Sequence, residues 1–199
     1  MSAVRRIAVP FLACPLVLLA AACSDPASPS LADRDAALLA SASDVRQVTV
    51  PFTSHFFTKE TSFGPDPVCG APPRFLTTQE GTGEATHLGR FSISITFCID
   101  AADLLADGQL TDGESLPYDG GVGVLTAANG DELHITIAGA VLPTDHPDFD
   151  FEFDDPYVIT GGTGRFAGAT GSGTTNSFVL SQVATTHNWT GSLTFLPGR

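Results

Sequence analysis

The sequence predicts an all-β protein: a single antiparallel closed barrel of about eight strands, preceded by a signal peptide and a flexible tether. After residue 44, apolar and polar residues alternate with a period of two in several segments, and no long segment there shows helical periodicity. The 199 residues include 20 Gly and 14 Pro, too many for a helical bundle. One sheet of this length either pairs with a second sheet or closes, and closure removes exposed edges.

The N-terminal segment has the layout of a secretory signal. Arg5 and Arg6 form a basic start, and residues 7–22 form an apolar run that ends in small residues. A membrane-spanning helix needs about 20 apolar residues, and this run is shorter and contains Pro10 and Pro15. We therefore expect residues 1–22 to be an export signal that is removed.

Cys23 follows three alanines directly, and this arrangement resembles the lipobox of bacterial lipoproteins, although Leu19 lies one place further from the cysteine than the usual leucine. Of four cysteines, Cys14 leaves with the signal, so lipid on Cys23 leaves an even pair. The resemblance implies diacylglycerol and acyl chains on Cys23 that anchor the protein to a membrane of the bacterial cell envelope. Soluble secretion and an uncleaved anchor are the alternatives.

The remaining pair is Cys69 and Cys98, 29 residues apart. In an oxidising compartment such a pair is expected to form a disulfide, worth about 3 to 4 kcal/mol on the chain-entropy model. Two unpaired buried thiols are the alternative. A zinc site is disfavoured because neither cysteine has a second cysteine or histidine at ligand spacing.

The domain organisation follows from a change in composition. Residues 23–44, rich in Ser, Ala, Pro and Asp, are predicted to be the lipidated N-terminus and a tether, and residues 45–199 form the barrel domain. Pro51 marks the first strand as an edge or a bulge. Asn129-Gly130 predicts a hairpin with both turn residues at positive φ. The predicted strands are 48–52, 91–97, 122–126, 133–140, 149–153, 177–183 and 186–195.

A glycine-rich segment at 157–174 formally matches a dinucleotide fingerprint through Gly162, Gly164 and Ala167. The match fails because more glycine follows in place of a helix and no Asp or Glu occurs after Asp155. A phosphate-binding loop is also absent, since the only lysine is Lys59. Nucleotide binding is therefore not expected. The structural interpretation is a tight turn in which Phe166 plugs the barrel end and the later glycines permit a coiled strand.

The same segment, Gly-Gly-Thr-Gly-Arg-Phe-Ala-Gly-Ala-Thr-Gly at 161–171, resembles the signature of allene oxide cyclase-like and dirigent-like β-barrels, particularly exported bacterial members without assigned activity. Residues 85–90 and 127–133 are similar to that bacterial group as well. The resemblance implies an eight-stranded, often homo-oligomeric barrel with an apolar cavity. In plants this fold holds a fatty-acid-epoxide cyclase or proteins that steer phenol radical coupling. No pocket residue of either group matches, so no catalytic role is transferred.

The charge of -13 argues against nucleic-acid binding, and residues 100–155 contain fourteen carboxylates without Lys or Arg. Within this stretch, residues 103–114 resemble a calcium loop at Asp103, Asp107 and Glu114 but offer Leu105 at the third ligand position. A solvated loop is the preferred interpretation and calcium the alternative. In 145–155, acids alternate with phenylalanines, which places the rings on the core or cavity side.

Among the histidines, His87 near Arg90 is the best candidate for ligand contact, but a hydrogen-bonded structural role at the start of a strand is the preferred interpretation and ligand contact the alternative. The sequence thus predicts an envelope lipoprotein whose barrel binds a small apolar ligand without catalysis. An isomerase or cyclase acting in the cavity is one alternative, and a structural or protein-interaction module is another. The enzyme would need a buried ionisable group facing the ligand.

Replacing Cys23 by Ser tests the anchor. We expect Cys23→Ser to move the protein from the membrane fraction to the soluble fraction, because the thioether that carries the lipid cannot form. Fractionation followed by immunoblotting measures the change, and membrane retention of the variant would contradict the lipid assignment.

Overall fold

The computed structural model describes residues 46–180 and 184–197. By internal contacts the chain divides into two units, residues 1–44 and 45–199. The described residues all belong to the second unit. The predicted signal peptide, the lipid site at Cys23 and the tether lie outside the described residues. Among the residues that are described, no helix is both long enough and apolar enough to cross a membrane.

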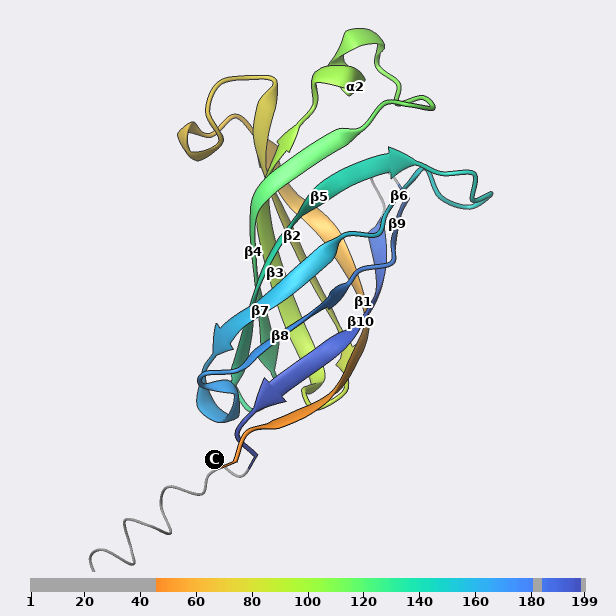
Figure 1. The fold of residues 1–199 in the computed structure, drawn as a ribbon. Helices are drawn as coiled ribbons and strands as arrows, with labels where there is room; N and C mark the ends of the chain where they lie inside the picture. The colour runs from red at the N-terminus through yellow and green to blue at the C-terminus, as the bar shows by residue number, and fades with distance from the viewer. Residues whose placement is uncertain (1–45, 181–183, 198–199) are drawn as a thin grey trace, which may run out of the picture. The chain divides into compact units, whose positions relative to one another are not determined.

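The domain is an all-β barrel, as predicted, and all strand pairs are antiparallel (Figure 1). In chain order the elements are β1 (Val48–Gly64), η1 (Pro67–Cys69), β2 (Arg74–Ala85), β3 (Gly89–Asp100), α2 (Ala102–Asp107), β4 (Leu116–Ala127), β5 (Glu132–Pro143), β6 (Phe151–Phe153), β7 (Pro156–Gly162), η2 (Gly164–Phe166), β8 (Thr170–Thr174), β9 (Ser177–Leu180) and β10 (Ala184–Phe195).

The ten strands form a ring of eight positions. β1 to β5 are neighbours in order, β5 pairs with both β6 and β7, and β10 pairs with both β8 and β9. β6 and β7 follow each other along one line, as do β8 and β9, because the pairs Phe153↔Ser177 and Pro156↔Thr174 share one register. β1 closes the ring by pairing with β10 from Val48↔Phe195 onwards.

The break between β6 and β7 is built around Asp155. Its backbone N–H donates to the Thr175 hydroxyl at 2.8 Å, while the Thr175 N–H donates to the Asp155 carbonyl at 2.9 Å. The carboxylate accepts from the Ala140 N–H at 3.3 Å and from the Tyr118 hydroxyl at 2.8 Å. A Cβ atom at Gly139 would overlap this carboxylate, so glycine there gives it room. The side chain of Asp155 thus replaces missing ladder contacts at the break.

One end of the barrel is filled with side chains. Phe166 from η2 is fully buried, and its ring centroid lies 5.8 Å from that of Phe195. The glycine-rich segment therefore forms a plugged turn, as predicted. The other buried residues at this end include Phe52, Leu88, Phe91, Leu125, Leu133 and Leu193.

The later glycines of the segment have a packing role. A Cβ atom at Gly173 would collide with the Tyr157 ring, and one at Gly171 would press on the Ile159 side chain. Tyr157 in turn stacks on Trp189 with ring centroids 4.9 Å apart. Small residues on β8 thus make space inside the barrel for large ones on β7 and β10, an alternation that closed barrels use to fill a tapering interior.

Two details of the predicted strands need correction. The hairpin at Asn129-Gly130 joins β4 to β5, but among its described residues only Gly130 has positive φ, at 88°. The Asp131 N–H instead donates to the side-chain oxygen of Asn129 at 3.2 Å, and this local hydrogen bond stabilises the turn. The predicted strand at 149–153 is also shorter, since β6 begins at Phe151.

Pro51 lies within the closed sheet without disrupting it. It pairs with Ser192 of β10, whereas pairing with β2 starts only at Ser54↔Ala85. The Thr53 N–H donates to the Thr86 hydroxyl on the side that faces β2. The backbone nitrogen of Pro51, two residues earlier, faces the same side at a point beyond the end of β2. The missing N–H of proline therefore costs no ladder bond, and the expectation of an edge-like position holds locally.

The predicted disulfide between Cys69 and Cys98 is present and joins η1 to β3. Both cysteines are buried. The bridge fastens the connection between β1 and β2 to the wall of the barrel, at the end opposite the Phe166 plug. The alternatives of free thiols and of a zinc site are excluded by this bond.

Candidate ligand-binding cavity

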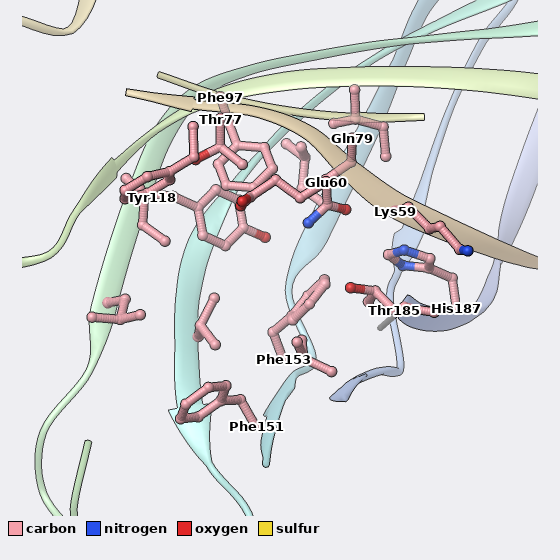
Figure 2. A pocket seen from close by; sticks show the side chains of 18 of the residues that line it. Lys59, Glu60, Thr77, Gln79, Phe97, Tyr118, Phe151, Phe153, Thr185 and His187 are labelled. Atoms are coloured by element: carbon pink, nitrogen blue, oxygen red, sulfur yellow. The ribbon is translucent and has the colours of Figure 1, made fainter. Parts of the chain in front are cut away.

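The end of the barrel opposite the plug holds a cavity of about 490 Å³ (Figure 2). The β1–β2, β3–β4 and β5–β6 connections, with η1 and α2, surround this end (Figure 1). Ligand cavities of small barrels are commonly of this size and apolar. Apolar side chains make up most of the wall and include Ile95, Phe97, Ile99, Leu116, Ile137, Val141, Phe151, Phe153 and Val179.

A β-bulge shapes the mouth. The register of β1 against β2 shifts between Glu60 and Ser62, so the residues beyond it change the side on which they lie. Phe63 consequently lines the cavity, although it is 50% exposed, and its ring stacks on Phe75 with centroids 5.0 Å apart. Without the bulge, Phe63 would continue the outward alternation of β1.

A chain of four hydrogen-bonded polar side chains lies beside the cavity, and two of them, Gln79 and His187, line it. The Thr58 hydroxyl donates to Oε1 of Gln79 at 2.9 Å, and Nε2 of His187 lies 2.9 Å from the same hydroxyl oxygen. Because the single hydroxyl hydrogen of Thr58 is directed at Gln79, His187 must donate from Nε2. Nδ1 of His187 then accepts from the Ser177 hydroxyl at 2.9 Å. The chain fixes one tautomer of the imidazole and uses both ring nitrogens.

His187 is kept neutral. Its ring is 1% exposed and stacks on Phe56 with centroids 4.3 Å apart. Burial, aided by the positive potential of His55, lowers the pKa of His187 to about 3. At neutral pH the imidazole is therefore an uncharged, fully bonded part of the wall.

Glu60 is the one carboxylate among the described residues that line the cavity. Partial burial raises its pKa above the usual range of a glutamate. Within the described part of the chain it makes no hydrogen bond or ion pair, and its partner in the strand register is the neutral Gln79. Figure 2 shows both side chains reaching into the cavity from neighbouring strands.

Two hydroxyls complete the polar wall. Thr77 is 2% exposed, and its Oγ1 has no hydrogen-bond partner in the described residues. Tyr118 donates to Asp155, and burial together with that hydrogen bond raises the pKa of Tyr118 far above 10. The phenol therefore stays protonated, whereas the buried Thr77 oxygen has no hydrogen-bond partner among the described residues.

The residues predicted to contact a ligand lie at the other end of the barrel. His87 occupies the β2–β3 turn with φ at 66°, and its ring lies 5.8 Å from that of Phe195. Arg90 borders a shallow depression with His55, Glu84 and Asn188. Neither His87 nor Arg90 lines the cavity.

The carboxylates of the calcium-loop candidate bond to their own loop. Asp103 accepts from the Ser115 N–H at 3.1 Å, and Asp107 accepts from the Gln109 N–H at 3.0 Å. Glu114 accepts from both the N–H and the hydroxyl of Thr111. Across residues 46–180 and 184–197, no three His, Cys, Asp or Glu side chains are grouped to hold a metal ion.

The sequence interpretation missed the polar chain but placed two phenylalanines correctly. Phe151 and Phe153 line the cavity, whereas Phe149 packs against Phe178 with ring centroids 5.3 Å apart. A signal for the missed residues existed in the alternation: Thr58 continues the inward series of β1, and His187 precedes inward Trp189 by two residues. What alternation could not show is that the two meet, since they lie 129 positions apart.

No protein-family model matches this chain, and no curated protein is similar to it at the level required for a match. The resemblance to allene oxide cyclase-like and dirigent-like barrels therefore stays a prediction that short segments carry.

The neutral His187 predicts a pH dependence of stability. Its pKa is about 3 in the folded protein and about 6.5 in the unfolded chain, so protonation favours unfolding. Stability due to this group is complete above pH 6.5 and falls by about 1.4 kcal/mol per pH unit as the pH drops toward 3. The raised pKa values of Glu60 and Asp155 act in the opposite direction.

His187→Gln should remove this part of the slope, because glutamine does not titrate. Urea unfolding at pH 7, 6, 5 and 4 measures it, with His146→Gln, at an exposed histidine, as the matched control. Equal slopes for wild type and His187→Gln would contradict the assignment.

Proposed function

We propose that this protein is a binding module that takes a small, largely apolar molecule into the open end of its barrel and does not transform it. The observation that carries the proposal is the cavity of about 490 Å³ at one end of a barrel whose other end is packed. A wall of aliphatic and aromatic side chains with a few polar groups on one side is the usual composition of a small-molecule site.

The polar groups support binding over catalysis. Both nitrogens of His187 are occupied by Ser177 and Thr58, so the imidazole has no free position for proton transfer. The Tyr118 hydroxyl donates to Asp155 and faces that partner. Among the described lining residues, Glu60 is the one free ionisable group with a shifted pKa, and the other charged lining residue, Lys59, follows the opposite alternation of β1.

An isomerase or cyclase is the second candidate, and Glu60 is the observation that favours it. Glu60 lies exposed at the mouth of the cavity, and a carboxyl of raised pKa beside apolar walls is a common proton acceptor. Under that hypothesis, the rearrangement of a bound substrate would stop in Glu60→Gln while binding persisted.

We further propose that the barrel is displayed in the bacterial cell envelope, exported and lipid-anchored through Cys23. The lipobox-like sequence supports the anchor. The Cys69–Cys98 disulfide is consistent with an oxidising compartment. The cavity would then sample small molecules outside the cytoplasm.

Filling the cavity tests the binding proposal. Val141 lines the cavity and its neighbour Leu142 points outward at 43% exposure. We expect Val141→Trp to weaken binding of the neutral apolar fluorophore N-phenyl-1-naphthylamine by about tenfold or more, because the indole occupies the space of the ligand.

Leu142→Trp is the matched control and should bind like wild type. Fluorescence titration gives both affinities, and circular dichroism confirms that each variant is folded. If the wild type fails to bind the fluorophore, or if both tryptophans act alike, the cavity is not the binding site.

A further inference from the structure

We propose that the molecule bound in the cavity is an organic cation: an apolar body carrying one ammonium group that pairs with Glu60. This inference rests on the proposed binding function and adds the chemical class of the ligand. It is carried by four features of the open end of the barrel, which concern a carboxylate, a hydroxyl, aromatic rings and the charge around the mouth.

The first feature is the unpaired carboxylate. Glu60 extends from β1 into the cavity, and no described cation pairs with it. Lys59 also borders the cavity, but it follows the opposite alternation of β1 and its register partner is Glu80. The lysine thus has an acidic neighbour, whereas the neighbour of Glu60 is neutral Gln79. A cationic ligand would supply the counter-charge that the protein itself omits.

The second feature is the Thr77 hydroxyl, which is independent of Glu60. It lines the same cavity, is 2% exposed, and leaves Oγ1 without a partner among the described residues. A buried polar atom without a partner costs free energy, so a ligand hydrogen at this position would be stabilising. An ammonium group has several N–H donors, so it can bond to more than one polar group at once.

The third feature is the ring-lined wall. Phe97 and Tyr118 lie with ring centroids 5.1 Å apart, and Tyr118 and Phe153 with centroids 6.2 Å apart. All three line the cavity. The negative faces of aromatic rings attract ammonium groups, and such attraction grows when the cation is removed from water.

The fourth feature is the charge at the mouth. The end of β3 and the β3–β4 connection bring five carboxylates to this end, at residues 100, 103, 107, 112 and 114, and the β5–β6 connection brings three, at 145, 148 and 150. Residues 100–155 contain no Lys or Arg. Nearby Arg74 is already engaged with Asp119 and the Cys69 carbonyl. Carboxylates thus outnumber the cations Lys59 and Arg74 at this end, and such an excess of negative charge concentrates cations and repels anions.

Three ligands that share a ten-carbon chain and differ only in their head group test which head group the cavity prefers. Isothermal titration of the full chain with decylammonium, decanol and decanoate, below micellar concentrations, measures the preference. We expect decylammonium to bind about tenfold or more tightly than decanol, and decanoate to bind most weakly, because a charge-assisted hydrogen bond exceeds a neutral one.

Glu60→Gln should abolish the preference for the amine over the alcohol. Glu84→Gln, which removes the same charge from the exposed outer face of β2, should retain it. Decanol or decanoate binding as tightly as the amine to the wild type would overturn the inference while leaving the binding function intact. Persistence of the amine preference in Glu60→Gln would also overturn it, and binding of none of the three would overturn both.

Discussion

The pairing of β1 with β10, from Val48↔Phe195 to Thr58↔Thr185, joins the two ends of the sheet and turns it into a ring. Every inward side chain then faces the inward side chains of other strands, and among the described strands no long sheet edge stays open to solvent. The same pairing puts Thr58 beside His187, and with β2 and β9 it completes the polar chain that includes Gln79 and Ser177. Closure is therefore the constraint on which both the core and the cavity depend.

The distribution of side-chain size divides the closed interior into a packed half and a hollow half. At the plugged end, Phe166 and its neighbours fill the space, and glycines on β8 admit the large rings of Tyr157 and Trp189. On the side of Trp189 away from the plug, the aromatic side chains line the wall and leave a cavity of about 490 Å³. Because packing at one end supplies much of the hydrophobic stabilisation, the other end is left available for a ligand.

The sequence was sufficient for the fold class because alternation with a period of two is a local signal. The strand at 91–97, the hairpin around Gly130 and the buried Phe166 were all predicted from residues within a few positions of one another. The resemblance to known barrels, which no comparison bears on, also led to this architecture. Pairing between distant strands has no local signal, so the cavity could be neither located nor measured in advance.

The site was less predictable for the same reason. His87 stood out because it lies in a distinctive segment, but that segment forms a turn at the end of the barrel away from the cavity. Glu60 belongs to no sequence motif, and its position at the cavity depends on β1 continuing as far as the bulge. The alternation of acids and phenylalanines in 145–155 predicts that Asp155 faces outward. The break between β6 and β7 instead directs its carboxylate to Tyr118.

A high-resolution crystal structure of the protein grown with decylammonium tests the central claim most directly, since that claim is an open cavity with a defined polar wall. The account predicts electron density for one extended molecule inside the barrel, with its nitrogen within hydrogen-bond distance of Glu60 and its chain between Phe97 and Phe153. A cavity filled by the protein's own side chains, or a ligand bound only outside the barrel, would contradict it.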